Sequence, residues 1–328
     1  MKKTFTILLM LFAINGFSQI PSGYYNSAEG LAGDALKSAL HNIIDNHTEK
    51  SYNAIRYILD ETDRDPNNSN NVILIYKGSS VSGVWDSGAT WNREHVWAKS
   101  HGDFGTSAPA GSDLHHIRPA DPSVNSSRGN KDFDNGGTPH HEAIGCFHDS
   151  DSWEPRDEVK GDVARMMFYM AVRYEGDVSG EPDLELVDYT GTSGSIFGKL
   201  SALRQWHEQD PVDDFERNRN NVIYSHQGNR NPFIDHPEYV EAMFNPPSTN
   251  ASLIEKDAIE IYPNPVLNEL NVVAPENTTR ELYTIIGEKL KSWKEETIDV
   301  SDLDAGIYFV IVKDNFGVTI KNQKIIKK

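Results

Sequence analysis

The sequence predicts an α+β protein in which a helix-rich domain is followed by a small all-β sandwich. Three observations predict it. Apolar residues recur at helical spacing before residue 245, the composition changes to Pro, Ser and Asn at residues 245–250, and short Ile-, Leu- and Val-rich runs alternate with turns after residue 258. We expect four parts, at residues 1–18, 19–244, 245–257 and 258–328.

Residues 1–18 have the pattern of a secretory signal peptide. Lys2 and Lys3 form a basic start, residues 7–14 are apolar, and small residues at 16–18 suit cleavage. The apolar run is too short to span a bilayer, and no later run reaches that length. We therefore expect an exported protein with no stable membrane insertion. We also expect a monomer.

Outside residues 91–131, several helices and one strand are expected in the main domain. A helix at residues 27–47 would begin at Ser27, and a helix at 161–174 would place three methionines in the core. The single cysteine, Cys146, excludes an intramolecular disulfide and stands in an apolar run that favours burial. Further helices are expected at 195–208, 213–224 and 237–244, and a strand at 72–76.

Residues 91–131 stand out in this acidic chain of net charge −18, because they contain five basic and four acidic residues. Their turn residues predict a strand at 91–97, a loop at 101–112 and a second strand at 113–118. Asp121 followed by Pro122 is typical of a helix start, and Gly129 can end that helix. The pattern is therefore strand, loop, strand and short helix.

This unit can bring an imidazole and two oxygen ligands around one point. Glu94 and Asn125 offer the oxygen atoms that a hard cation such as Mg²⁺ or Ca²⁺ prefers, and His95 can remain free as a base. Neighbours on a regular strand point to opposite faces. We therefore expect the chain to leave the pleat at Glu94 and His95. We also expect the adjacent Glu94 to favour the imidazolium form of His95.

The motifs at residues 93–97, 113–119 and 124–130, in this order, resemble those of the bacterial endonuclease I family, of the His-Me finger or ββα-metal superfamily. The resemblance implies that His95 is the general base and that Glu94 and Asn125 hold one divalent cation, Mg²⁺ or else Ca²⁺ or Mn²⁺. It implies a secreted endonuclease at residues 19–244 that hydrolyses DNA and/or RNA with little sequence preference, leaving 5′-phosphate ends.

Three arginines are candidates for contact with the substrate. Arg128 can bind phosphate in the catalytic site or pair with aspartate. We favour phosphate, because guanidinium groups match phosphate oxygens bidentately and Arg128 lies one helical turn from Asn125. Arg118 can hold phosphate or pair with aspartate. Arg230 belongs to residues 227–237, which resemble the closing motif of the family, and it can reach the nucleic-acid backbone or help to hold an irregular loop.

The C-terminal residues 258–328 resemble the sorting domain of the type IX secretion system. The resemblance rests on the motifs at residues 262–265, 305–308 and 324–328. It implies that the type IX machinery is a partner and that the protein is secreted or held at the cell surface. The alternative is a small β module that binds carbohydrate or another partner, because such sandwiches serve many functions.

Two other function classes remain open. One is a zinc hydrolase that uses His115, His116, His140 and His141, although no HExxH spacing is present. The other is a noncatalytic secreted binding protein. The net charge of −18 predicts weak, salt-sensitive binding of nucleic acid.

Overall fold

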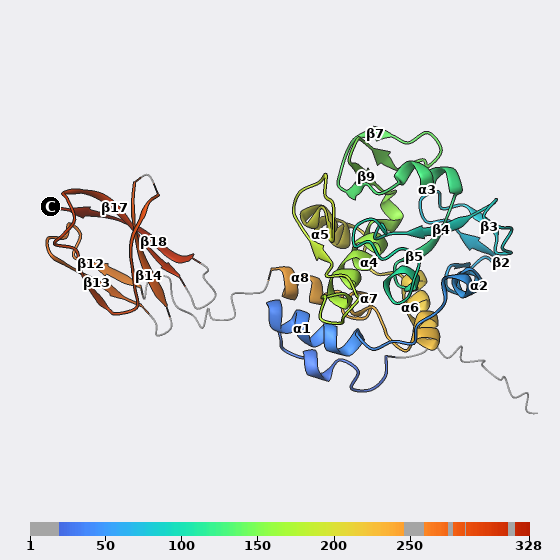
Figure 1. The fold of residues 1–328 in the computed structure, drawn as a ribbon, viewed down its shortest axis with the longest axis horizontal. Helices are drawn as coiled ribbons and strands as arrows, with labels where there is room; N and C mark the ends of the chain where they lie inside the picture. Colours follow the sequence, from blue (N-terminus) through green and yellow to red (C-terminus); the bar gives the residue numbers. More distant parts are fainter. Residues whose placement is uncertain (1–19, 246–258, 275–277, 286, 314–318) are drawn as a thin grey trace, which may run out of the picture. The chain divides into compact units, whose positions relative to one another are not determined.

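The computed structural model describes residues 20–245, 259–274, 278–285, 287–313 and 319–328 (Figure 1). The chain divides into two compact units, residues 1–246 and 247–328, which we describe separately. The expected signal peptide at 1–18 lies outside the described residues, as does the expected linker apart from its first residue.

The first unit combines helices with short strands. Its helices are α1 (Gly33–Ile44), α2 (Tyr52–Thr62), α3 (Pro122–Arg128), α4 (Lys160–Arg173), α5 (Leu200–Gln209), α6 (Asp214–Gln227), α7 (Pro232–Asp235) and α8 (Tyr239–Phe244), with 3₁₀ turns at Asn26–Ala28, Ala110–Ser112 and Asp157–Val159. Its strands are β1 (Arg64–Asp65), β2 (Asn68–Ile73), β3 (Ser80–Ser82), β4 (Asn92–His95), β5 (Ile117–Ala120), β6 (Asp132–Phe133), β7 (Thr138–Pro139), β8 (Phe147–His148), β9 (Ser152–Glu154), β10 (Glu185–Leu186) and β11 (Ile196–Phe197).

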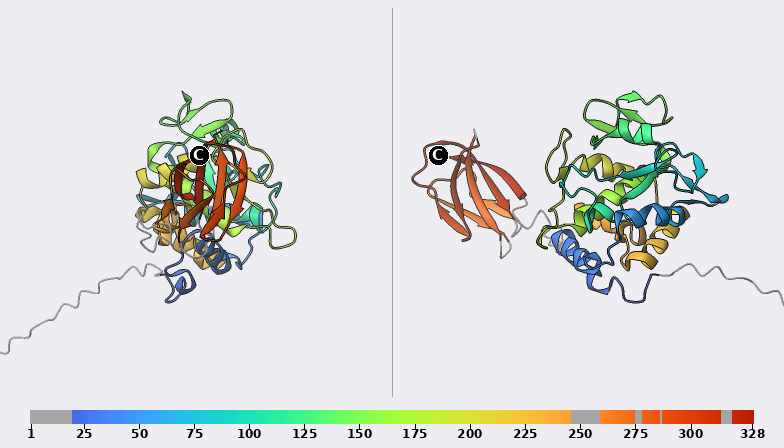
Figure 2. Two further views of the ribbon diagram at one scale, coloured as in Figure 1. Left: turned by 90° about the vertical axis from the view of Figure 1, so that its left-hand side faces the viewer. Right: turned by 45° about the vertical axis from the view of Figure 1, so that its right-hand side comes forward.

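Helix α4 forms the centre of this unit. Every residue of α4 is buried, and the helix packs against α1, α5 and α7. The methionines at 166, 167 and 170 belong to the main hydrophobic core, as expected. The small sheets lie toward the margins, with β2 and β3 at one side and β7 and β9 at another (Figures 1 and 2). No helix within the described residues is both long enough and apolar enough to cross a membrane.

Strands β4 and β5 and helix α3 form the unit expected at residues 91–131. The two strands are antiparallel, with Asn92 opposite Ala120 and His95 opposite Ile117. The Asp121 side chain caps α3 by accepting hydrogen bonds from the amides of Ser123 and Val124. Helix α3 follows β5 after the single residue Asp121, and it contacts β4.

The second strand begins later than expected. Residues 113–116 form a turn, and β5 starts at Ile117. The cause is the buried carboxylate of Asp113, which accepts hydrogen bonds from the His115 amide and from the hydroxyls of Tyr169 and Tyr174, each at 2.9 Å. These bonds hold the backbone in a turn in place of the expected strand.

The N-terminal elements also differ from expectation. The helix expected from Ser27 begins at Gly33, because the chain turns through Gly30, whose φ of 71° is in the left-handed region. The strand expected at 72–76 is β2, which ends at Ile73. Helix α2 was not expected, although the Ser51 hydroxyl caps it by accepting a hydrogen bond from the Ala54 amide.

The second unit is all-β, as expected. Its strands are β12 (Glu260–Tyr262), β13 (Glu269–Val273), β14 (Thr279–Thr284), β15 (Lys289–Trp293), β16 (Thr297–Asp299), β17 (Gly306–Lys313) and β18 (Thr319–Lys327). They form two sheets, of order β12-β13-β16 and β15-β14-β17-β18. Apolar residues of both sheets, including Val272 and Val310, share one core. The whole chain is therefore α+β in class.

Candidate active site

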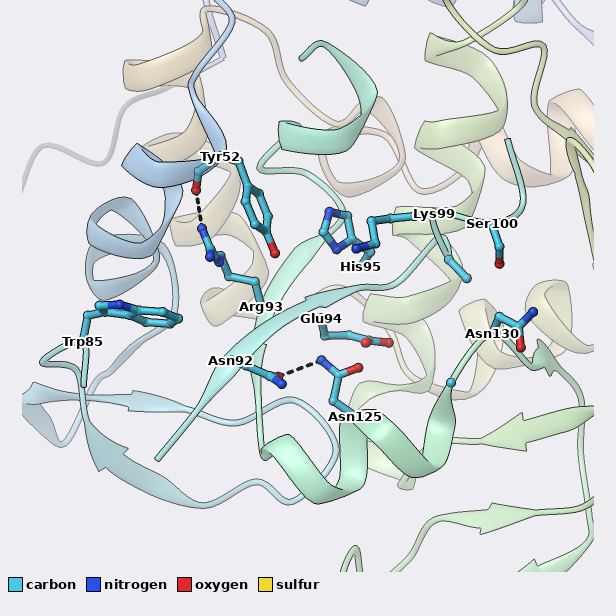
Figure 3. Close-up of a pocket in the computed structure, with 12 residues that line it drawn as sticks. Tyr52, Trp85, Asn92, Arg93, Glu94, His95, Lys99, Ser100, Asn125 and Asn130 are labelled. Atoms are coloured by element: carbon cyan, nitrogen blue, oxygen red, sulfur yellow. Dashed lines mark hydrogen bonds between the residues drawn. The ribbon is translucent and has the colours of Figure 1, made fainter. Parts of the chain in front are cut away.

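A cavity of about 470 Å³ opens beside the β4–β5–α3 unit (Figure 3). The expected site residues Glu94, His95 and Asn125 line it, together with Asn92, Arg93 and Tyr52. Strand β4 supplies four of these six side chains, α3 supplies Asn125, and α2 supplies Tyr52.

The cavity receives side chains from both faces of β4. Figure 3 shows Arg93 and His95 on one side of the strand and Asn92 and Glu94 on the other. The chain does not leave the pleat as expected, since β4 remains a regular strand through His95. Among the described residues β4 pairs only with β5, so its other edge is free. Both faces can therefore contribute to one cavity at that edge.

Glu94 and Asn125 present oxygen atoms to the same space. The Tyr76 hydroxyl donates to Glu94 Oε1 at 2.7 Å, and the Asn125 amide nitrogen donates to Asn92 Oδ1 at 2.7 Å. This second bond turns the amide oxygen of Asn125 toward the Glu94 carboxylate (Figure 3). One carboxylate and one amide oxygen fit a hard divalent cation that keeps several water ligands.

The Glu94 carboxylate is buried, and burial raises its pKa although Arg128 and the Tyr76 hydrogen bond act to lower it. A cation bound here would favour the ionised form, because opposite charge at short distance offsets desolvation. The donor set and its electrostatics therefore both suit a cation.

His95 is buried and has a defined tautomer. Its Nε2 atom lies 3.1 Å from the carbonyl oxygen of Gly111, so Nε2 carries the hydrogen and Nδ1 keeps its lone pair. The Tyr52 ring stacks on the imidazole with centroids 5.5 Å apart. Burial lowers the pKa of His95 well below its ordinary value, and the nearby His116 lowers it further. The expectation that Glu94 favours imidazolium is therefore wrong, since desolvation dominates.

Arg128 lies behind Glu94 and does not line the cavity. Its guanidinium is fully buried, donates to the Val96 carbonyl at 2.7 Å, and places Nε 3.4 Å from Glu94 Oε1. The ring of Phe133 lies 4.7 Å from the guanidinium carbon. In this structure Arg128 holds the Glu94 carboxylate in place.

Arg118 and Arg230 also lie away from the cavity. Arg118 is 1% exposed and pairs with Asp63 and, at 2.9 Å, with Asp162. Arg230 is 2% exposed and donates to Asp235 at 2.8 Å. These contacts agree with the second interpretation given for each residue, in which Arg118 pairs with aspartate and Arg230 helps to hold an irregular loop. Neither reaches the space where a substrate would bind.

The histidines of the zinc alternative do not gather into a ligand set. His116 Nε2 bonds to the Ala110 carbonyl at 2.8 Å, His140 Nε2 lies 2.9 Å from the Ser127 hydroxyl, and the His115 ring packs on Tyr169 with centroids 4.3 Å apart. Over the described part of the chain, no three His, Cys, Asp or Glu residues group as a metal site would require. His115 and His116 are buried, and their rings are held by contacts within the protein.

Several residues of the cavity were not foreseen. Asn92 and Arg93 stand directly before Glu94, so the motif itself points to them. Tyr52 precedes Asn92 by 40 residues in the sequence, and Tyr76 precedes Glu94 by 18 residues. No local pattern marks these two tyrosines, because only the packing of α2 and of the segment after β2 brings them here.

Comparison with known proteins agrees with these observations. Residues 32–238 match the family model described as Endonuclease I, and residues 260–328 match the secretion system C-terminal sorting domain. The chain is 61% identical over 225 residues to an extracellular ribonuclease of Bacillus subtilis (strain 168), covering 67% of this chain and 78% of that protein. An extracellular ribonuclease of Bacillus amyloliquefaciens is 60% identical with the same coverage.

A more distant relative is an extracellular deoxyribonuclease of Aeromonas hydrophila, which is 30% identical over 128 residues, or 38% of this chain and 49% of that protein. The family match extends over the β4–β5–α3 unit and all residues of the cavity. The chain therefore belongs to the endonuclease I family, and it carries a C-terminal sorting domain of the type IX secretion system.

Proposed function

We propose that this hydrolytic nuclease is a secreted, divalent-metal-dependent endonuclease that cleaves DNA and/or RNA with little sequence preference and leaves 5′-phosphate ends. One observation carries the proposal: the imidazole of His95 and the side-chain oxygens of Glu94 and Asn125 face a single cavity at the free edge of β4. This arrangement offers a base and a cation site on the two sides of a bound phosphodiester.

His95 acts as the general base. Nδ1 takes a proton from the attacking water, while the Nε2 bond to the Gly111 carbonyl keeps the ring oriented and fixes the tautomer. The stacked Tyr52 ring limits movement of the imidazole. Because the attacking and leaving oxygens lie on opposite sides of phosphorus, the base and the cation must flank the phosphate.

Glu94 and Asn125 would hold the cation, with Asn92, Tyr76 and Arg128 keeping these two side chains in position. Mg²⁺ is the cation we favour, and Ca²⁺ or Mn²⁺ has the same preference for oxygen. When bound, the cation neutralises charge on the phosphate and on the leaving 3′ oxygen. When the P–O3′ bond breaks, the upstream fragment keeps a 3′-hydroxyl and the phosphate stays on the 5′ oxygen of the downstream fragment.

The substrate is proposed to include RNA, because the relatives at about 60% identity are named ribonucleases. DNA is retained because the relative at 30% identity is named a deoxyribonuclease. The acidic chain predicts binding that weakens steeply with salt.

We further propose that residues 1–18 direct export, that residues 19–244 are the catalytic domain and residues 245–257 a linker, and that residues 258–328 engage the type IX secretion machinery. The chain is proposed to act as a monomer. Secretion or a cell-surface location follows from the sorting domain and from the extracellular relatives.

The experiment that tests the function incubates purified protein with plasmid DNA and with RNA, with Mg²⁺, with chelator, and with Mg²⁺ restored. We expect cleavage inside both polymers, loss with chelator and recovery with Mg²⁺. Labelling the products with and without prior phosphatase treatment identifies 5′-phosphate ends. Cleavage that persists in chelator would exclude metal dependence, and binding without cleavage would support the noncatalytic alternative.

A further inference from the structure

Arginine and aromatic side chains alternate beside the cavity. The Arg93 guanidinium carbon lies 3.5 Å from the centre of the Tyr52 ring and 5.1 Å from that of Trp85. Arg56, on α2, lies 5.8 Å from Trp85 and 4.8 Å from Tyr57. Figure 3 shows Tyr52 between Arg93 and His95, so the run begins at the catalytic imidazole. We name these five residues, Tyr52, Arg93, Trp85, Arg56 and Tyr57, the arginine–aromatic strip.

The charges of the strip have no carboxylate partner. In the part of the chain that the structure describes, neither Arg56 nor Arg93 forms an ion pair, whereas buried arginines elsewhere, such as Arg118 and Arg165, do. The acidic neighbour of Trp85, Asp86, is engaged by the amide and hydroxyl of Thr90. Arg93 donates a hydrogen bond to the Tyr52 carbonyl and Arg56 donates one to the Tyr57 hydroxyl at 3.1 Å, and neither of these partners carries a negative charge. In a chain of net charge −18, both guanidinium groups can therefore contact phosphate.

The strip also ends in an exposed aromatic ring. Tyr57 is 61% exposed, so its ring is accessible to a partner. Trp85 and Tyr52 line the cavity itself. Alternation of arginines with accessible rings is the arrangement that binds single-stranded nucleic acid, since arginines contact phosphates and rings stack on unpaired bases. In a duplex the base faces are stacked inside the double helix, so only the arginines of the strip could contact it, through its phosphates.

We propose that the arginine–aromatic strip binds an unpaired nucleic-acid strand next to the scissile phosphate, with Arg93 and Arg56 on phosphates and Tyr57 against a base. This inference rests on the proposed nuclease function and adds to it a preference for single-stranded or locally unpaired regions. It also assigns substrate binding to arginines other than Arg118, Arg128 and Arg230.

The test measures binding in the His95→Ala background, in which cleavage is slowed, with a short single-stranded oligonucleotide and with the same sequence as a duplex, both in Mg²⁺. Tyr57→Ala should weaken single-strand binding by between about fivefold and a hundredfold, the range for losing one stacked base, and leave duplex binding unchanged. Arg56→Gln should reduce the slope of log affinity against log salt by about 0.7, the value for one phosphate contact on a single strand.

Arg217→Gln is the matched control, because Arg217 is an exposed arginine on α6 and does not line the cavity. It should leave the single-strand affinity unchanged.

Unchanged single-strand affinity in both strip variants, or an equal loss on single strand and duplex for Tyr57→Ala, would overturn the inference. These outcomes are separate from failure of the proposed function, which would appear as no cleavage of any nucleic acid by the unmodified protein.

Discussion

At the scale of single residues, the site depends on how burial sets the chemistry of Glu94 and His95. Burial raises the pKa of the Glu94 carboxyl and lowers the pKa of the His95 imidazole, so each is pushed toward its neutral form. A neutral imidazole can accept a proton. A bound cation stabilises the ionised form of a buried carboxylate more than that of an exposed one. The two shifts therefore serve the two proposed roles.

Replacing His95 with alanine should lower turnover by about 10²- to 10⁴-fold, the usual contribution of a positioned base. Affinity for oligonucleotide in Mg²⁺ should remain, because the imidazole is not a proposed ligand of the cation. The measurement is single-turnover cleavage alongside binding. His141→Ala is the control, since His141 is exposed and outside the cavity. Full turnover in the His95 variant would place the base elsewhere.

The pH profile of the unmodified enzyme tests the same residue. Because the pKa of His95 is lowered, the basic form persists as the pH falls through the ordinary histidine value of about 6.5. We expect kcat/KM at saturating Mg²⁺ to hold through that value and to fall only at distinctly lower pH. An acidic limb centred at or above the ordinary value would contradict the buried, neutral imidazole.

Asn125→Ala should raise the Mg²⁺ concentration needed for half-maximal activity by at least about tenfold, and Asn92→Ala should do so by about 10- to 100-fold, because Asn92 orients the Asn125 amide. Titrating activity with Mg²⁺ measures both. Asn130→Ala is the control, since Asn130 is an exposed amide at the edge of the same cavity. An unchanged Mg²⁺ requirement in the Asn125 variant would remove that residue from the ligand set.

At the scale of elements, α3 links the local sequence to the site. Asp121 caps the helix and Pro122 starts it, so Asn125 falls in the first turn, opposite Glu94 on β4. The free edge of β4 then makes side chains from both strand faces available. A short helix and one unpaired strand edge are therefore enough to assemble the proposed base and cation ligands.

Asp121→Ala should lower the free energy of unfolding by about 1 kcal/mol, because two amide hydrogen bonds at the start of α3 are lost. Asp121→Asn should cost less, since asparagine keeps an acceptor for those amides and loses only the charge that faces Lys77. Urea unfolding of both variants measures the difference. Equal losses in the two variants would show that the charge, and not the cap, stabilises this helix.

At the scale of the whole molecule, the two units have separate cores and separate proposed tasks. The cavity is lined entirely by residues between Tyr52 and Asn130, within the first unit. The second unit has its own hydrophobic core and matches a sorting domain. Catalysis should therefore not require the second unit.

Deleting residues 246–328 should leave the purified protein with the specific activity of the full chain, while release from the native cell is lost. Activity assays on both purified proteins, with immunodetection in the medium and in cells, measure the two effects. A truncated protein that folds but does not cleave nucleic acid would assign part of the site to the second unit. Normal release of the truncated protein would contradict the sorting role.

The sequence by itself predicted the α+β class, the all-β C-terminal region and α4, because these depend on periodicity over many residues. It also predicted that Glu94, His95 and Asn125 gather in one place, since the cap at Asp121 and the turn-forming residues act locally. The start of β5 was mispredicted because a distant pair of tyrosines binds Asp113 and holds the preceding residues in a turn.

Only the tertiary structure decided the environment of each charged group. The sequence could not show that Arg118 pairs with Asp63 and Asp162, or that Arg93 lies between the rings of Tyr52 and Trp85 with no carboxylate partner among the described residues. Nor could it show that burial, and not the adjacent Glu94, sets the pKa of His95. The physical reason is that desolvation and ion pairing depend on neighbours in space, and those neighbours come from elements far apart in the chain.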